Sequence, residues 1–134
     1  MIALDTNVVV RFLTQDDPQQ YAQAASLLAG LSPDRPGFLC REVMVELVWV
    51  LERAYHLPRH DIAAAIDGLL AAKELQIEAA DRVGLAVERY RLGGAGFSDQ
   101  MIALAAMDNG CDATFSFDRK AVAGAGMASV PASF

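Results

Sequence analysis

The sequence lacks any apolar run long enough to cross a bilayer, which takes roughly 20 consecutive apolar residues, although 54% of its 134 residues are hydrophobic. It also lacks an N-terminal basic segment followed by a long apolar one, so a secretory signal is not expected. We therefore expect no membrane association and a cytoplasmic location. The length and the apolar content fit one compact domain over residues 1–134.

Cysteine and histidine are scarce, with two residues of each kind. Cys40 and Cys111 match no zinc-ligand spacing and give no disulfide framework, and we expect both to be buried free thiols in a reducing cytosol. His56 and His60 are four residues apart, but Pro58 between them disfavours a shared helical face. These observations argue against a zinc site.

Basic residues are outnumbered, with 11 Lys and Arg against 17 Asp and Glu, which gives a formal net charge of −6. On charge alone this composition disfavours nucleic-acid binding, because phosphate contacts need Lys and Arg. Acidic residues that gather in a metal site would, however, be neutralised by the cation. The charge therefore leaves a metal-dependent enzyme that acts on nucleic acid open.

Helical and extended patterns alternate along the chain. Strands are expected over residues 2–4, 38–40, 75–78, 113–116 and 126–130, and the first of them should be buried. Helices are expected over residues 8–13, 21–31, 41–55, 61–73, 81–92 and 98–109, with a short one from 118 to about 123. This alternation predicts an α/β fold in which a parallel sheet is covered by helices on both faces. The run Gly93–Gly96 is not a dinucleotide-binding motif, because it follows a helix and not a strand.

Two aspartates stand where predicted strands end. Asp5 follows the first strand, and Asp118 follows the fourth strand by two residues. Ligands of open α/β sheets bind outside the carboxyl ends of the strands, so both positions suit a functional site. The simpler alternative is that each aspartate only caps the helix that follows it.

Two further acids belong to predicted helices. Glu46 lies within the most apolar helix, over residues 41–55, which we expect to be buried on most sides. A buried carboxylate there needs a cation or hydrogen bonds as compensation. It could instead pair with an arginine or face outward with Glu42, one turn before it. Asp99 follows Ser98 at a helix start, where the helix dipole alone would favour an acid. If the fold gathers these acids, a hard divalent cation such as Mg²⁺ would relieve their repulsion.

Four stretches together resemble the PIN-domain family, and within it the VapC-type ribonuclease toxins of bacterial toxin–antitoxin pairs. They are Leu4-Asp5-Thr6-Asn7-Val8-Val9-Val10, Val45-Glu46-Leu47-Val48-Trp49-Val50-Leu51, Gly96-Phe97-Ser98-Asp99-Gln100-Met101-Ile102-Ala103 and Thr114-Phe115-Ser116-Phe117-Asp118-Arg119-Lys120. Each motif alone is weak, but four in the right order with the right gaps are specific. The resemblance covers essentially the whole chain.

The resemblance implies a three-layer α/β/α sandwich with a central parallel sheet of strand order 3-2-1-4-5. It also implies a Mg²⁺- or Mn²⁺-dependent endoribonuclease that acts on RNA, forms a homodimer and is held by a cognate antitoxin encoded beside it. The family's acidic residues fall on Asp5, Glu46, Asp99 and Asp118, which are the expected catalytic and metal-binding residues. Supporting positions fall on Asn7 and on Ser116, where the family more often has Thr.

Four further residues are weaker candidates for the site, and two other protein classes are alternatives to a nuclease. Glu42 is a further candidate acid, and Arg11, Arg119 and Lys120 are candidate phosphate contacts, although they could equally be solvated surface charges. A haloacid-dehalogenase-like phosphatase would need a second Asp at position 7, where Asn7 stands. A receiver-type phospho-signalling module would need an acid pair after the first strand, which Asp5-Thr6 does not supply.

Overall fold

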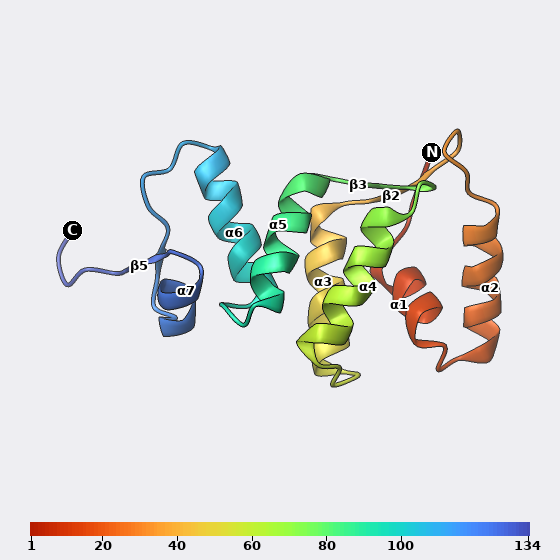
Figure 1. Cartoon of the computed structure of the whole chain (residues 1–134), viewed down its shortest axis with the longest axis horizontal. Helices are drawn as coiled ribbons and strands as arrows, with labels where there is room; N and C mark the ends of the chain where they lie inside the picture. Colours follow the sequence, from red (N-terminus) through yellow and green to blue (C-terminus); the bar gives the residue numbers. More distant parts are fainter. The chain divides into compact units, whose positions relative to one another are not determined.

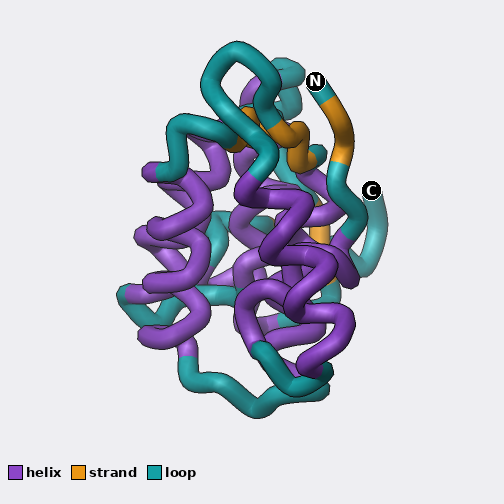
Figure 2. The backbone as a smooth tube through the Cα atoms, turned by 90° about the vertical axis from the view of Figure 1, so that its right-hand side faces the viewer, coloured by secondary structure: helices purple, strands orange, loops and turns teal.

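The computed structural model describes all residues, 1–134, and the chain divides into two compact units. The N-terminal unit comprises Met1–Ala80, and the C-terminal unit comprises Asp81–Phe134. Most of the chain is helical and the strands are short (Figure 2). No helix is both long enough and apolar enough to span a membrane. That residues 1–134 form one domain stays a prediction.

The N-terminal unit consists of a small parallel sheet and four helices (Figure 1). The strands are β1 (Ile2–Ala3), β2 (Gly37–Leu39) and β3 (Leu75–Ile77), and the helices are α1 (Thr6–Thr14), α2 (Pro18–Ala29), α3 (Arg41–Arg53) and α4 (Arg59–Ala71). β2 is the central strand, with Gly37 opposite both Ile2 of β1 and Leu75 of β3. A side chain at Gly37 would collide with leucines around it, which explains a glycine in this strand.

Two of the four helices in this unit, α1 and α2, start at an aspartate that caps them. Asp17 caps α2 by accepting a hydrogen bond from the backbone N–H of Gln20 at 3.0 Å, and Pro18 occupies the first helical position. α1 packs against α2 and α3, and α3 packs against α4. The buried side of α3 contributes Met44, Leu47, Val48 and Leu51 to the core.

The C-terminal unit contains the remaining elements. They are α5 (Ala80–Arg91, whose first residue closes the N-terminal unit), α6 (Phe97–Asp108), β4 (Phe115–Ser116), α7 (Arg119–Gly124) and β5 (Ala128–Ser129). β4 and β5 are parallel, with Phe115 opposite Ala128. The rings of Tyr90 and Phe97 meet edge to face with centroids 6.3 Å apart, and both side chains are buried.

The fold class is confirmed as α/β with parallel strands and seven helices, and a three-layer sandwich is consistent with it. The predicted strand order 3-2-1-4-5 is shown in two parts, β3-β2-β1 and β4-β5. The pairing of strand 1 with strand 4 that joins these parts stays a prediction.

Two burial predictions were wrong. The first strand is not buried, because Ile2 and Ala3 are exposed in a two-residue strand at the edge of its sheet, and only Leu4 after it is buried. The cysteines are not buried either: Cys111 is exposed in the segment between α6 and β4, and Cys40 is half-buried just before α3.

Candidate active site

Asp5 is the N-cap residue of α1, as the capping alternative predicted. Its Oδ1 accepts a hydrogen bond from the backbone N–H of Thr6 at 2.7 Å, and its side chain is exposed. The cap uses one carboxylate oxygen and stabilises the start of the helix. The other oxygen keeps its lone pairs, so capping and ligand binding are compatible at this residue.

Thr6 is buried directly beside Asp5, with 4% of its surface exposed. Its Oγ1 has no hydrogen-bond partner in the protein. A buried hydroxyl without a partner is costly and needs an explanation, such as an ordered water or a ligand. Thr6 was not among the predicted site residues, so its buried hydroxyl is a feature that the sequence did not reveal.

Glu46 is exposed, and the expectation that α3 is buried on most sides was wrong. One stripe of the helix is solvent-facing, with residues spaced by one helical turn: Glu42, Glu46, Trp49 and Arg53. The Arg53 guanidinium lies 6.0 Å from the centroid of the Trp49 ring, and Trp49 is 57% exposed. The outward-facing alternative for Glu46, shared with Glu42, is therefore the correct one.

Asp118 and Asp99 belong to the C-terminal unit. Asp118 caps α7, because its Oδ1 accepts hydrogen bonds from the backbone N–H groups of Lys120 at 2.8 Å and Ala121 at 3.4 Å. Ser116 Oγ accepts a hydrogen bond from the backbone N–H of Asp118 at 2.9 Å, which fixes the turn that carries this acid. Asp99 lies in the first turn of α6 and is partly exposed.

None of the four predicted metal ligands is part of an ion pair. The ion pairs of the protein use other carboxylates, among them Asp16, Glu78, Glu88 and Asp108. Asp5, Glu46, Asp99 and Asp118 thus have no arginine or lysine that competes for their charge, and oxygen donors of this kind suit Mg²⁺ or Mn²⁺. In neither unit do three or more metal-ligating side chains form a group that could hold a metal by themselves.

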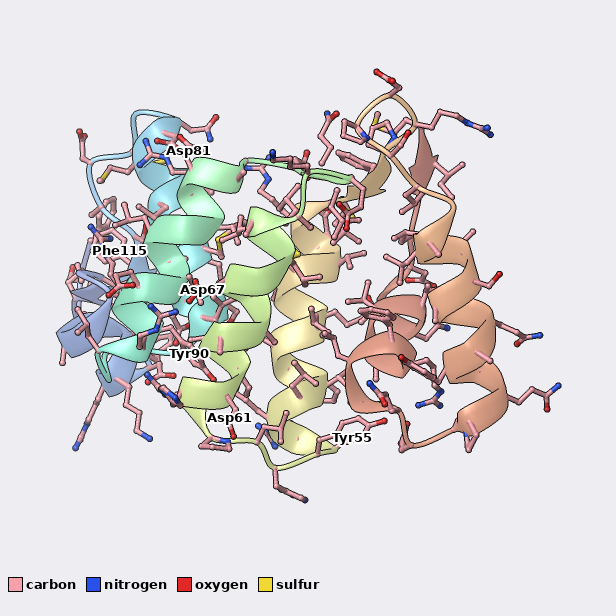
Figure 3. The ribbon with its side chains drawn as sticks, turned by 45° about the vertical axis from the view of Figure 1, so that its right-hand side comes forward. Tyr55, Asp61, Asp67, Asp81, Tyr90 and Phe115 are labelled. Atoms are coloured by element: carbon pink, nitrogen blue, oxygen red, sulfur yellow. The ribbon has the colours of Figure 1, made fainter.

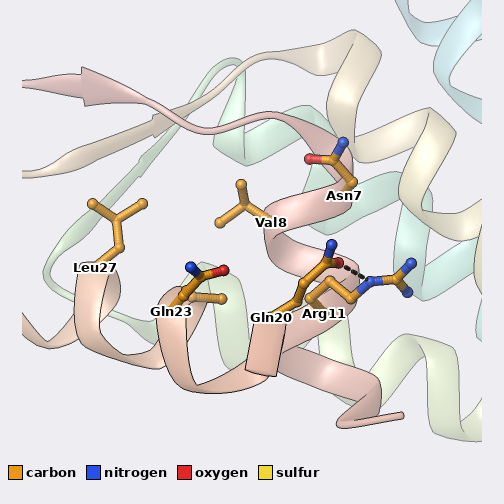
Figure 4. Close-up of a pocket in the computed structure, with 7 residues that line it drawn as sticks. Asn7, Val8, Arg11, Gln20, Gln23 and Leu27 are labelled. Atoms are coloured by element: carbon orange, nitrogen blue, oxygen red, sulfur yellow. Dashed lines mark hydrogen bonds between the residues drawn. The ribbon is translucent and has the colours of Figure 1, made fainter. Parts of the chain in front are cut away.

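The basic candidates differ in their surroundings. Arg11 is held by three neighbours: its Nε donates to Gln20 Oε1 at 2.5 Å, and its Nη1 donates to Tyr55 Oη at 3.2 Å and to Asp16 Oδ1 at 3.4 Å. It lines a cleft with Asn7 between α1 and α2 (Figure 4). Arg119 and Lys120 are exposed at the start of α7.

A family model for the PIN domain matches residues 2–125. The chain belongs to the PIN domain family. The match includes residues of both compact units and all four predicted acids, so it extends over nearly the whole chain. PIN domains are generally nucleases and typically use divalent metal ions. A comparison with curated proteins gave no match.

Sequence reasoning missed several features of this PIN domain. Trp49 was counted among the apolar residues of a buried helix, although its spacing from Glu42 and Glu46 already placed it on their stripe. Gln20 and Gln23 were not singled out, because isolated glutamines on a helix carry no local signal. The structure places both in the cleft that contains Asn7 and Arg11.

Proposed function

We propose that this PIN domain is a Mg²⁺- or Mn²⁺-dependent endoribonuclease, the toxin of a toxin–antitoxin pair. The observation that carries the proposal is the family match over residues 2–125. All four acids of the family pattern are present within it, and none is neutralised by an ion pair.

The proposed ligands are Asp5, Glu46, Asp99 and Asp118, binding directly or through waters. When bound, the divalent cation would lower the pKa of a coordinated water and offset charge on the scissile phosphate. Asp5 suits this role because its position is fixed by its cap to Thr6. Asp118 is fixed in the same way by its own cap and by Ser116.

The chain's other residues have supporting roles in this proposal. Ser116 positions the backbone of Asp118, and the Thr6 hydroxyl is available to hold a water beside Asp5. Asn7 presents its amide to the substrate side, where no protein group uses it, and Glu42 extends the acidic stripe of α3. Arg119 and Lys120 are available for phosphate contacts at the start of α7.

The partner proposal is that a cytoplasmic homodimer binds a helical, apolar segment of a cognate antitoxin. An apolar cavity of about 330 Å³ lies in the N-terminal unit. α1 and α4 line it with Val9, Phe12, Leu13, Ala65, Leu69 and Ala72, joined by Leu28 of α2. An apolar groove of this kind suits an amphipathic helix. A basic side chain near that helix could then pair with the unpaired acids and inhibit the enzyme.

The test is cleavage of RNA by the purified protein with Mg²⁺, with Mn²⁺ and with chelator. Asp5→Asn should keep the cap oxygen and abolish cleavage. Asp17→Asn is the matched control, because Asp17 is also an N-cap aspartate and should tolerate the change with full activity. Cleavage that is unaffected by Asp5→Asn would contradict the proposed site. Release of phosphate from small phosphomonoesters, without RNA cleavage, would favour the phosphatase alternative.

The toxin assignment has its own test. The neighbouring reading frame is co-expressed, the mass of the complex is measured by light scattering, and RNA cleavage by the complex is assayed. A protein that stays monomeric and is not inhibited by that neighbour would argue against a toxin, and would leave a stand-alone nuclease.

A further inference from the structure

A cleft of about 380 Å³ lies between α1 and α2 in the N-terminal unit (Figure 4). It is lined by three amide side chains, one guanidinium and three apolar side chains: Asn7, Gln20, Gln23, Arg11, Val8, Ala24 and Leu27. No carboxylate lines it, although the chain has 17 acidic residues and a net charge of −6. The guanidinium of Arg11 forms an ion pair with Asp16 at 3.4 Å, and Asp16 is not among the residues that line the cleft. The cleft therefore presents hydrogen-bond donors and no carboxylate to a ligand.

Part of the polar lining is held in place. Arg11 Nε donates to Gln20 Oε1, so the Gln20 amide is oriented and its nitrogen remains available as a donor. The hydroxyl of Tyr55 accepts a hydrogen bond from Arg11 Nη1, which anchors the guanidinium from the other side. Two groups already fixed in this way lose less entropy when a ligand binds.

The other two amide side chains that line the cleft are free to bind a ligand. The side chains of Asn7 and Gln23 form no hydrogen bond with other protein groups, and both line the cleft. An amide side chain offers a donor and an acceptor together, which is the pattern that a nucleobase edge also presents. The neighbouring aliphatic surface includes Leu27, which is 41% exposed, and could lie against the face of a base.

We propose that this cleft binds one nucleobase of the RNA, in the nucleotide next to the scissile phosphate, and that Gln23 reads its edge. The proposal rests on the nuclease function proposed above. Asn7 links the two sites, because it lines the cleft and is two residues after Asp5. Nη2 of Arg11, whose Nε and Nη1 are used by Gln20, Tyr55 and Asp16, is the donor for the phosphate of the same nucleotide, and the amides supply base preference.

The experiment compares Gln23→Leu with Gln19→Leu, which makes the same change at an exposed position of α2 outside the cleft. Each protein cleaves a randomised single-stranded RNA, and the ends of the products are sequenced. Gln23→Leu should raise KM about tenfold and flatten the preference at one nucleotide, the effect expected when one amide loses two base contacts. Gln19→Leu should match the wild type in both respects.

A second measurement separates this inference from the nuclease proposal. The four nucleoside 5′-monophosphates are titrated into metal-free protein, and the side-chain amide signals are followed by NMR. Shifts of the Gln23 amide with one base more than with the others support the cleft even if no RNA is cut. A wild type that cuts RNA, with Gln23→Leu unchanged in KM and preference, would overturn it. So would a Gln23→Leu variant that loses only its inhibition by the antitoxin, because the cleft would then belong to a protein partner.

Discussion

The hydroxyl of Tyr55 donates a hydrogen bond of 2.7 Å to Asp16 Oδ2, across 39 residues of sequence. Tyr55 follows the end of α3 (Figure 3), and Asp16 lies in the turn between α1 and α2. The Thr14 hydroxyl donates to the other oxygen, Oδ1, at 2.9 Å, and Arg11 contacts the same atom at 3.4 Å. One carboxylate in the turn between α1 and α2 thus connects α1 to the segment that follows α3.

These contacts make the stability of the protein depend on the charge of Asp16. The hydrogen bond from Tyr55, followed by that from Thr14, lowers the pKa of Asp16. A carboxyl whose folded-state pKa is lowered contributes stability above its unfolded pKa, near about 3.9, and loses it as the pH falls through the folded value. Asp16→Asn should therefore be less stable than the wild type at pH 7, and the difference should be smaller at pH 3, which lies below the unfolded pKa.

Chemical denaturation at the two pH values measures this difference. Tyr55→Phe, which removes the largest cause of the shift, should show the same convergence toward the wild type at low pH. A stability deficit of Asp16→Asn that is equal at pH 7 and pH 3 would show that the charge of Asp16 is not involved.

Metal binding should stabilise the folded protein, because a cation that binds only the folded state shifts the unfolding equilibrium toward that state. A cation at one hundred times its Kd would add about 2.7 kcal/mol to the free energy of unfolding. We expect Mg²⁺ or Mn²⁺ to raise the melting temperature of the wild type, and Asp99→Asn to weaken the effect. Asp34→Asn changes the charge equally at an exposed loop position and should respond as the wild type does. No change up to millimolar metal would refute the site.

Glu46→Gln should separate activity from stability. Because Glu46 is exposed and unpaired, its substitution should change the free energy of unfolding by less than about 0.5 kcal/mol. RNA cleavage should nevertheless be lost. Glu42→Gln, one turn earlier on the same stripe, should retain more activity if Glu42 is only a supporting acid. Assays of both variants with matched melting curves measure this, and normal cleavage by Glu46→Gln would remove it from the site.

The order of the elements was predictable because local chemistry sets it. Asp17-Pro18 starts α2, and Gly110 follows α6 with a φ of 75°, as expected of a residue that ends a helix. Four of the five predicted strands were too long, because strand length depends on pairing partners: β1, β4 and β5 have two residues each, and β3 ends at Ile77. The strand predicted over residues 38–40 had the right length but begins one residue earlier, at Gly37. The cap hydrogen bonds of Asp5 and Asp118 were likewise foreseen, since each joins residues no more than three apart.

The surroundings of side chains were harder to predict. The apolar content of α3 does not say which side packs, so the sequence left both a buried and an outward-facing Glu46 open, and Trp49 was wrongly placed on a buried side. Tyr55 and Asp16 are far apart in the sequence and are brought into contact only by the tertiary fold, so no local sequence pattern predicts their hydrogen bond. The same holds for the cleft between α1 and α2, because its amides come from two helices.

Thr6→Val tests whether the buried hydroxyl serves the proposed site. Valine has nearly the same shape, and the change removes an Oγ1 that has no protein partner. If Thr6 only fills space in the core, Thr6→Val should raise the free energy of unfolding, by about 1–3 kcal/mol if the hydroxyl is fully desolvated. If the hydroxyl holds a water beside Asp5, the variant should melt at an equal or higher temperature and yet cleave RNA more slowly, with kcat lowered more than KM is raised.

Thr6→Ser, which keeps the hydroxyl, should recover cleavage. A Thr6→Val protein that melts lower than Thr6→Ser would mean that Oγ1 has a partner in the folded state, and full activity in Thr6→Val would exclude it from the reaction.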